Sequence, residues 1–301
     1  MISYLKYDNM KNIVLFLMFS MCHCFTVAQC NGNAVYEWDD ALIEWGPNNR
    51  VHYVLDYDEL RLNTKNVDLM VVLKSGISGL FKRIDNGVDD GGVVICSDNG
   101  VVWERIFDQS TYDVNWFEPF KDSVTNDRDV IQRVLDLIHK KGGGVCYLPR
   151  GNYFISNGGN HGGLILYDNT TLKGDGYEST IIWDGTAGSP VQNQFSSGFY
   201  TPQEASKGNE NIHLKDFKIK FQTTTDAVGI AVSLAGVNGG SIDNVCISDC
   251  GGYSILLSRT NDAPGVNSSV CNDIKISNCT ITGMRDVGIE FWGARNCNVS
   301  N

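Results

Sequence analysis

Three segments in the second half of the chain share one alternating pattern of apolar and polar residues. They are NIHLKDFKIKF at 211–221, GSIDNVCIS at 240–248 and DIKISNCTIT at 273–282. Alternation with a period of two residues is typical of a β-strand with one buried side. When the segments are superposed, three columns of equivalent residues appear: Asp216, Asn244 and Asn278; Phe217, Val245 and Cys279; and Ile219, Ile247 and Ile281.

Each of these segments is followed by a second short apolar strand. The sequences are VGIAVS at 228–233, YSILLS at 253–258 and VGIEFW at 287–292. Their superposition places Ile230, Ile255 and Ile289 in one column, and Val232, Leu257 and Phe291 in another.

A repeat of this kind predicts a parallel β-helix. No single coil can bury its own apolar side chains, but coils stacked about 4.8 Å apart bury them together and pair their backbone groups. We expect the polar column to form a structural hydrogen-bonded ladder at a bend of the coil. A leucine-rich repeat is the main alternative, although the units lack its leucine spacing and its regular length.

One amphipathic α-helix precedes the repeats. The segment TNDRDVIQRVLDLIHKK at 125–141 has a candidate N-cap at Thr125 or Asn126, and a Gly142–Gly144 stop. Its apolar residues fall on one face, and we expect the helix to cover the open end of the first coil, where unpaired strand edges would otherwise be exposed. From residue 31 to 117 the chain alternates strand-like segments with Gly, Asn and Asp turns, which predicts a small antiparallel β module.

The N-terminus is typical of a secretory signal peptide. A basic start at Met10-Lys11-Asn12 precedes the apolar run 13–25 and the small-residue site 26–28. The run is too short to span a bilayer. We therefore expect a secreted or extracytoplasmic protein with a signal peptide at 1–28, a β-rich module at 29–117 and a β-helix domain at 118–301.

The last residues match the opening strand of another coil. Cys297, Val299 and Asn301 fall under Ile274, Ile276 and Asn278. We therefore expect the coil stack to continue beyond Asn301, so that residues 118–301 are the N-terminal coils of the stack.

Charge and cysteine content narrow the function classes. A formal net charge of -11 and a pI of about 4.8 argue against nucleic-acid binding, which needs a basic surface. They do not exclude an acidic polysaccharide held by a few local Lys and Arg residues or by calcium. The 10 cysteines show no metal-ligand spacing, so we predict no metal site. Disulfides are permitted in an oxidising compartment, but their pairing does not follow from the sequence. The oligomeric state does not follow from the sequence either.

Strand alternation places candidate chemistry on the last coil. If Ile289 and Phe291 point inward, Glu290 and Trp292 point outward, where an aromatic ring can hold a sugar and a carboxylate can act as acid or base. Asp286 lies about 13 Å from Glu290 along one strand at ~3.3 Å per residue, too far for a glycosidase acid pair.

Two arginines near these acids offer a different chemistry. Arg259 and Arg285 lie on flanking turns and could bind a uronate or act as the base of a lyase. The simpler role for each arginine is an ion pair with Asp262 or Asp286.

Several motifs together resemble a known family. The segments DSVTNDRDVIQRVLDLIHKKGGGVCYLPRGNYFIS at 122–156 and TTLKGDGYESTIIW at 170–183 resemble the N-terminal signature of the pectate lyase superfamily of β-helix proteins. The preceding residues 79–117 are similar to the small β module of phage tailspike-like and bacterial depolymerase proteins. The resemblance implies an all-β fold built on a right-handed parallel β-helix, and a secreted or surface protein that acts on polysaccharide as a lyase, glycosidase or epimerase.

The catalytic motifs of the family are incomplete in this chain. Polygalacturonase-type members carry Gly-Asp-Asp-Cys-Ile-Ala, and the matching GMRDVGIEF aligns Asp286 with the second acid while Arg285 replaces the first. A Gly-His-Gly motif is absent, since His161 stands in NHGG. The candidate catalytic residues are therefore Asp286, Glu290 and Arg285, and the candidate substrate-binding residues are Trp292, Arg259 and Asp262.

The prediction for function is a secreted protein that cleaves or modifies a uronate-containing polysaccharide. The sequence identifies no cofactor, and calcium is expected only if the protein is a lyase. The alternatives are a non-catalytic glycan-binding or adhesive β-helix and a sugar epimerase.

Overall fold

The computed structural model describes residues 43–45, 49–156, 163–183, 188–196, 206–222, 229–260 and 268–301, with side chains from Val51 onward. The chain divides into two units, Met1–Ile43 and Glu44–Asn301, and the account below concerns the second. The predicted signal peptide at 1–28 and the candidate residue Asp262 lie outside the described residues.

The first sheet of the chain is mixed, not antiparallel as predicted. Its strand order is β1-β2-β3-β4-β6-β5, and β2 pairs with β3 in parallel while the pairs from β3 to β5 are antiparallel. The parallel pair is joined through a short helix, α2, at Tyr57–Leu62. Asp56 caps this helix by accepting hydrogen bonds from the backbone N–H groups of Asp58 and Glu59, both at 3.1 Å. The elements are β1 Ile43–Trp45, β2 Asn49–Val54, β3 Leu69–Val72, β4 Gly79–Ile84, β5 Val94–Cys96 and β6 Val102–Arg105.

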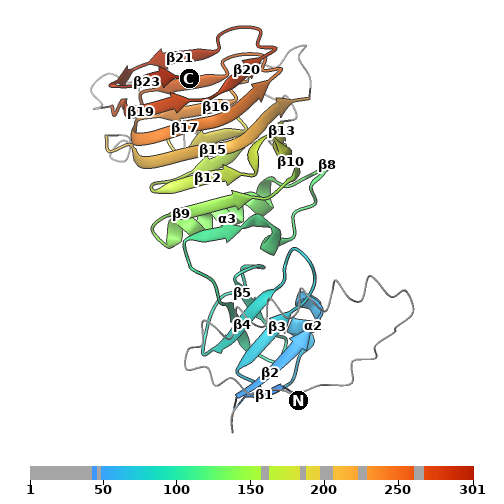
Figure 1. Ribbon diagram of the computed structural model, residues 1–301. Helices are drawn as coiled ribbons and strands as arrows, with labels where there is room; N and C mark the ends of the chain where they lie inside the picture. Colours follow the sequence, from blue (N-terminus) through green and yellow to red (C-terminus); the bar gives the residue numbers. More distant parts are fainter. Residues whose placement is uncertain are drawn as a thin grey trace, which may run out of the picture. The chain divides into compact units, whose positions relative to one another are not determined.

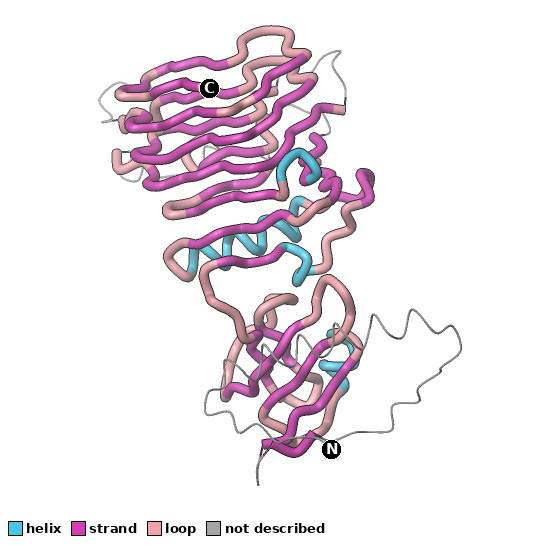
Figure 2. Tube along the Cα trace, viewed as in Figure 1, coloured by secondary structure: helices cyan, strands magenta, loops and turns pink. Residues whose placement is uncertain are grey.

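The remaining strands form the predicted parallel β-helix, in which every described strand pair is parallel (Figures 1 and 2). Two short 3-10 helices, η1 at Val114–Phe117 and η2 at Gly176–Glu178, and one α-helix, α3 at Arg128–Lys140, interrupt it. Its strands are β7 Thr111–Asp113, β8 Asp122–Asn126, β9 Gly144–Leu148, β10 Gly151–Ile155, β11 Leu164–Leu166, β12 Thr170–Gly174, β13 Ser179–Trp183, β14 Val191–Asn193, β15 Asn209–Phe221, β16 Val232–Ala235, β17 Val237–Ser248, β18 Ile255–Ser258, β19 Cys271–Ser277, β20 Thr280–Thr282, β21 Ile289–Trp292, β22 Ala294–Arg295 and β23 Asn298–Ser300.

The strands of the coils form three faces. The first face contains the whole strands β7, β9, β12, β19 and β23, together with the first halves of β15 and β17. The second face contains the whole strands β8, β10, β13 and β20, together with the second halves of β15 and β17. The third face contains β11, β14, β16, β18 and β21. The long strands β15 and β17 pass from the first face to the second, so one bend separates these two faces.

The observed register confirms most of the predicted columns. Ile219, Ile247 and Ile281 are paired across β15, β17 and β20, and Leu257 is paired with Phe291. The alignments of Ile230 with Ile255 and of Val232 with Leu257 are wrong, because Ile255 pairs with Val232 and Leu257 pairs with Leu234. A slip of two residues leaves the inward and outward faces unchanged, since strand faces repeat every two residues.

The bend between the first two faces uses left-handed backbone. Asp216, Asn244 and Asn278 have φ angles of 59°, 52° and 54°, a region in which Asn and Asp are tolerated better than other side chains. The Nδ2 of Asn244 donates to Oδ1 of Asp216 at 2.8 Å, whereas Nδ2 of Asn278 donates to Oδ1 of Asp243 at 2.8 Å. The polar column is thus hydrogen-bonded, although its last member bonds to the neighbour of Asn244.

A second left-handed bend lies at the start of the first face. Its members Asn169, Asn211, Asp273 and Asn296 have φ angles of 56°, 54°, 54° and 51°. Nδ2 of Asn211 donates to Oδ1 of Asn169 at 2.9 Å. The prediction from sequence did not include this bend.

Helix α3 occupies the third side of the first coil. It follows β8 and contacts β9 and β11, and its Ile131, Val134, Leu135 and Ile138 are fully buried. The helix starts at Arg128, later than predicted: Thr125 and Asn126 lie in β8, and the Asn126 side chain accepts a hydrogen bond from Arg128 N at 3.1 Å. The β-helix itself starts earlier than the predicted boundary at 118, because β7 already pairs with β9.

A continuous apolar core runs through the coils from Tyr112 to Ile276. All seven cysteines in the described part of the chain are free thiols. None of the described helices has the length and apolar character needed to cross a membrane.

Candidate functional site

The predicted residues Glu290 and Trp292 lie on β21, the last strand of the third face. Glu290 pairs with Leu256 and Trp292 pairs with Ser258. The residues that precede Glu290 in its column, Gln192, Ser233 and Leu256, are only 4%, 7% and 7% exposed. The third face therefore offers no open track of outward side chains leading to Glu290.

The other predicted residues lie on turns around the same coil. Arg259 N donates to the Trp292 carbonyl at 3.2 Å, so these two candidates are neighbours on successive coils. Arg285 and Asp286 are exposed in the turn between β20 and β21, and Arg285 N donates to the Cys250 carbonyl at 3.1 Å. In the described ranges, no cluster of three or more His, Cys, Asp or Glu side chains could hold a metal ion.

Lysines concentrate on the outward positions of β12 and β15. Lys173 on β12 pairs with Lys215 on β15 across the first face. Beyond the bend at Asp216, Lys218 and Lys220 take the two outward positions of β15 on the second face, where Lys218 pairs with Thr180 and Lys220 with Ile182. The inward residues between them, Phe217 and Ile219, are fully buried, so the lysines must face solvent.

These lysines are largely free to meet an anionic ligand. In the part of the chain that the structure describes, Lys173, Lys218 and Lys220 have no carboxylate within ion-pair distance, and Lys215 lies 4.0 Å from Asp216. Hydrogen bonds from Ser277 and Asn278, followed by the charges of Lys215 and Lys275, hold the pKa of Asp243 below its usual value. That carboxylate is thus ionised and accepts its hydrogen bonds from the next coil.

A histidine and a tyrosine lie beside the lysines on the first face. His213 precedes Lys215 by two residues, and its Nδ1 is 2.9 Å from Oγ of Ser241 on the next coil. Tyr147 on β9 pairs with Lys173, and its hydroxyl donates to Oδ1 of Asp175 at 2.5 Å. We call His213, Lys173, Lys215 and Tyr147 the first-face cluster.

Burial sets the protonation of two members of this cluster. Partial burial disfavours the charged imidazolium and lowers the pKa of His213, so the ring is neutral at neutral pH. Burial, followed by the bond to Asp175, raises the pKa of Tyr147 to about 12, so its hydroxyl stays protonated. The cluster therefore combines two cations, a neutral imidazole and a neutral phenol on one open surface.

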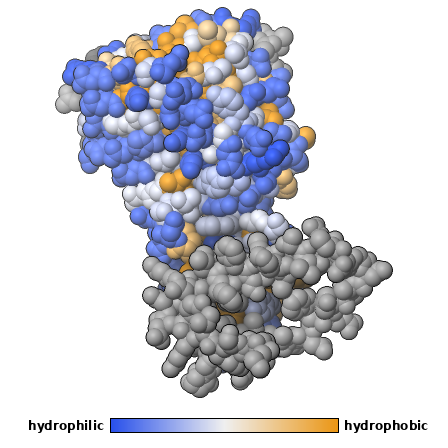
Figure 3. Space-filling view, in the orientation of Figure 1, coloured by the Kyte–Doolittle hydropathy of each residue, from blue (hydrophilic) through white to orange (hydrophobic). Residues whose placement is uncertain are grey.

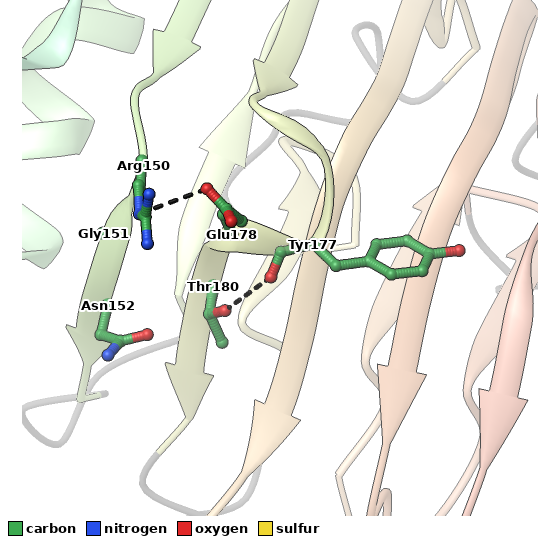
Figure 4. Close-up of a pocket in the computed structure, with 6 residues that line it drawn as sticks. All are labelled: Arg150, Gly151, Asn152, Tyr177, Glu178 and Thr180. Atoms are coloured by element: carbon green, nitrogen blue, oxygen red, sulfur yellow. Dashed lines mark hydrogen bonds and ion pairs between the residues drawn. The ribbon is translucent and has the colours of Figure 1, made fainter.

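The second face carries a shallow pocket of about 260 Å³ next to η2. Its lining consists of Arg150, Gly151 and Asn152 from the start of β10, Tyr177 and Glu178 from η2, and Thr180 from β13 (Figure 4). Hydrophilic residues cover much of the β-helix surface seen in Figure 3, and apolar residues gather at the last coil, where Met284, Phe291 and Val299 are exposed.

Sequence reasoning missed the first-face cluster, although its members lie in segments already singled out. His213 and Lys215 lie within NIHLKDFKIKF, the segment whose apolar column predicts the β-helix, as do Lys218 and Lys220 of the second face. Their outward positions follow from the same alternation that places Phe217 and Ile219 inward. The missed signal was therefore charge at the outward positions of a strand in an acidic chain.

The chain is similar to two groups of solved structures and curated proteins. Alginate lyase 7 of Azotobacter vinelandii is 40% identical over 80 residues, which is 24% of this chain and 9% of that protein. Mannuronan C5-epimerase AlgE6 of the same organism is 42% identical over 80 residues, 25% of this chain and 9% of that protein. The match thus spans less than a tenth of the length of these relatives.

Solved structures share the fold at low sequence identity. A tailspike protein, gp49 of Acinetobacter baumannii bacteriophage Fri1, a capsular polysaccharide depolymerase, has a TM-score of 0.57 and 12% identity, covering 81% of this chain and 46% of that one. WceF of Pantoea stewartii, a glycan biofilm modifying enzyme with a tailspike-like parallel β-helix, has a TM-score of 0.54 and 15% identity. The match covers 83% of this chain and 41% of WceF. At these identities the likeness concerns the fold.

The sequence model of one family matches residues 114–301, from η1 to the last residue. This range exceeds half of the chain and includes the first-face cluster and the second-face pocket. The chain belongs to the rhamnogalacturonase A/epimerase, pectate lyase-like family.

Proposed function

We propose that the protein binds a uronate-containing polysaccharide across the first face and modifies it by removing the proton next to the uronate carboxylate. The observation that carries this proposal is the first-face cluster, in which lysines flank a neutral histidine on an otherwise acidic chain. The names of the relatives support it, since both an alginate lyase and a mannuronan C5-epimerase act on uronate polymers.

Lys173 and Lys215 would hold the carboxylate of the sugar. They are paired on adjacent strands, about 4.8 Å apart, so two ammonium groups can bracket one carboxylate. Neutralising this charge lowers the barrier to removing the C5 proton, because the resulting carbanion places further negative charge on the carboxylate.

His213 would accept the C5 proton. Its side chain leaves the same strand as Lys215, two residues earlier, hence about 6.6 Å along the strand. A neutral imidazole is the protonation state that a base requires, and the contact with Ser241 fixes the ring.

Two outcomes follow from one proton abstraction. If the imidazolium passes the proton to the departing C4 oxygen, the C4–O bond breaks, a C4–C5 double bond forms and the chain is cleaved. If a proton returns to C5 from the opposite side, the sugar is epimerised and the chain stays intact. Tyr147, which remains protonated, supplies a hydroxyl that binds the substrate at the edge of the cluster.

Hydrolysis is the second candidate reaction, since the Fri1 tailspike is a depolymerase. It would use the predicted acids Asp286 and Glu290, with Arg285 beside them and with Arg259 and Trp292 as neighbours on the last coils. Asp286 lies in the turn before β21 and Glu290 lies on β21 after a column of buried residues, so the two acids do not form a pair on one open strand, and elimination or epimerisation is preferred. Secretion is part of the proposal and rests on the signal-like segment 10–28.

The test is incubation of the full chain with alginate and with polygalacturonate, with and without calcium and with a chelator. Elimination produces ultraviolet absorbance from unsaturated uronate ends, epimerisation changes the proton NMR signals of the anomeric centres without cleavage, and hydrolysis produces reducing ends alone. Binding without any of these products would contradict an enzymatic function and favour a glycan-binding protein.

The matched variants are His213→Gln and His52→Gln. The second removes a histidine from the first sheet, outside the β-helix. We expect His213→Gln to lower the rate at least 100-fold, as is typical for loss of a general base, with little change in polymer binding, and His52→Gln to leave the rate unchanged. Equal rates in the two variants would remove His213 from the mechanism.

A further inference from the structure

We propose that the second-face pocket is a separate glycan site that holds a uronate residue of the same polymer away from the reacting sugar. The ligand class rests on the proposed function, but the site shares no side chain with the first-face cluster. Its role would be retention of a long chain, not chemistry.

The pocket combines a cation, an aromatic ring and neutral hydrogen-bonding groups. Nε of Arg150 forms an ion pair with Oε2 of Glu178 at 3.2 Å, and Oγ1 of Thr180 donates to the Tyr177 carbonyl at 3.3 Å. Figure 4 shows that the Tyr177 ring extends from η2 away from this ion pair, and the residue is 44% exposed. Aromatic faces of this kind pack against the apolar face of a sugar ring, and the polar groups bind its hydroxyls.

Arg150 has donors to spare for a carboxylate. A guanidinium carries five N–H groups, and only the Nε group is engaged with Glu178 among the described contacts of this side chain. The remaining groups form the planar fork that pairs with carboxylates in two parallel hydrogen bonds.

The pocket continues into the lysines of β15. Asn152 pairs with Thr180, and Thr180 pairs with Lys218, so these outward side chains lie in one row across three strands. Lys220 stands two residues further along the second face. A chain that fills the pocket with one sugar would place neighbouring carboxylates near these two lysines.

The size of the pocket points to a single sugar. Sites for larger ligands enclose roughly 300–1,000 Å³, whereas this one measures about 260 Å³ and is shallow. Glu178 offsets the charge of Arg150 inside the pocket, so the preference for an acidic sugar over a neutral one rests on Lys218 and Lys220 beside it.

The turn that forms the pocket is tied to the first face through Asp175. One oxygen of Asp175 accepts the hydroxyl proton of Tyr147 at 2.5 Å, and the other accepts from the backbone N–H of Arg150 at 3.0 Å. The same turn is closed by Ser179, whose Oγ accepts from Asp175 N at 2.8 Å and donates to the Leu148 carbonyl at 2.7 Å. The pocket is thus built on backbone that is already fixed before a ligand binds.

The experiment measures Kd for polymannuronate and for a neutral dextran by affinity electrophoresis, and the rate on short and long uronate chains. Two double variants are used. One combines Tyr177→Ala with Arg150→Gln, and the other combines Lys218→Gln with Lys220→Gln. We expect each double variant to raise Kd for the acidic polymer about 5- to 30-fold, from the modest energy of exposed contacts, while the rate on a uronate trimer is unchanged. The single variant Tyr177→Phe keeps the ring and should bind like the natural protein.

The control is Lys140→Gln with Lys141→Gln, which removes two charges near the end of α3, away from the second face. Unchanged Kd in both pocket variants, or an equal rise in the α3 control, would overturn the proposed site. If the pocket variants turn over substrate and bind the acidic polymer with the Kd of the natural protein, this site is rejected and the proposed function stands. Binding that depends on the pocket, but without turnover, rejects the proposed function and leaves this site standing. Absence of binding by the natural protein contradicts both.

Discussion

At the scale of single residues, the direction of a side chain decides its chemistry. His213 and Lys215 alternate in sequence with the buried Ile212 and Leu214. Strand alternation alone turns the histidine and the lysine toward solvent. Partial burial against Ser241 then makes the histidine neutral, while the lysines beside it remain cations. The function that we propose depends on this difference between neighbours.

The protonation of His213 gives a stability that depends on pH. Because the folded state holds the pKa of His213 below that of a free histidine, the unfolded chain binds the proton first as the pH falls. Stability is therefore expected to decrease as the pH falls through the window just below the usual histidine pKa. NMR titration of the His213 ring should show a midpoint below that of free histidine, and His213→Gln should weaken the dependence of the unfolding free energy on pH in this window. A midpoint at or above the free value would contradict the prediction.

Arg105 is a buried cation whose partners are neutral. It is 2% exposed and donates to the Tyr57 hydroxyl at 2.7 Å, to the Ile77 carbonyl at 2.8 Å and to the Gly92 carbonyl at 3.2 Å. Its guanidinium also lies 4.6 Å from the ring centroids of Phe81 and of Trp116, which belongs to η1. The residue therefore joins β6 of the first sheet to the start of the β-helix.

Replacing Arg105 by Met should strongly destabilise this junction. The change keeps most of the volume but leaves several buried acceptors without a donor, which costs about 3–5 kcal/mol of unfolding free energy. Chemical denaturation measures the loss, and Arg83→Met on the exposed side of β4 should change it by less than about 0.5 kcal/mol. Similar losses in both variants would mean that the buried contacts of Arg105 contribute nothing.

At the scale of the element, the left-handed bends fix where each strand changes face. β15 and β17 remain continuous strands while turning at Asp216 and Asn244, because a side-chain amide bonds the two bends together. The bend contributes backbone conformation and a hydrogen bond, and these two parts can be separated by substitution.

Asn244→Ala should destabilise the protein more than Asn244→Gly. Alanine loses the amide bond to Asp216 and also disfavours a φ of 52°, for a total of about 2 kcal/mol, whereas glycine loses the bond alone, about 1 kcal/mol. Thermal or denaturant unfolding gives both values. Asn298→Ala on the exposed strand β23 is the control, and an equal loss for alanine and glycine at position 244 would exclude a contribution from backbone conformation.

Strand periodicity and helix amphipathicity were sufficient to predict the elements of the β-helix. Ile219, Ile247 and Ile281 could be aligned because burial repeats the same residue type in every coil. Local geometry was less accessible: the cap of α3 moved because Asp127 turns its carboxylate to the backbone N–H groups of Phe120 and Lys121, at 2.7 and 3.1 Å. The register of Ile230 failed because a shift of two residues preserves the pattern on which the alignment depends.

The candidate site was harder to predict than the fold. Strand alternation predicts outward positions for Glu290 and Trp292, but the residues that precede Glu290 in its column are buried. Tyr147, Asp175 and Arg150 come together only through the turn between β12 and β13, which no alternation pattern describes.

At the scale of the whole molecule, the β-helix is a stack in which each coil contacts its immediate neighbours. β15 is paired on both sides, with β12 and β13 on one and β17 on the other. β21 pairs only with β18, and β23 only with β19, within the ranges that the structure describes. Phe291 on β21 is 45% exposed, and Val299 on β23 is 50% exposed.

This arrangement predicts a gradient of local stability along the stack. Amides of Ile289–Trp292 and Asn298–Ser300 should exchange with solvent deuterium at least about 100-fold faster than those of β15, because local opening of a coil paired on one side breaks fewer contacts. Hydrogen exchange followed by mass spectrometry resolves these segments. Uniform protection from β12 to β23 would show that the coils unfold together.

The helix within the first coil also bears on the order in which the chain folds. The backbone hydrogen bonds within α3 join residues close in sequence, so the helix can form within microseconds, before any strand finds a partner. Each later coil then needs only the preceding coil as its template, and the entropy of closing one short loop is lost at a time. Growth of the stack thus runs in the direction in which a ribosome releases the chain, and folding can begin during synthesis without waiting for the last residue.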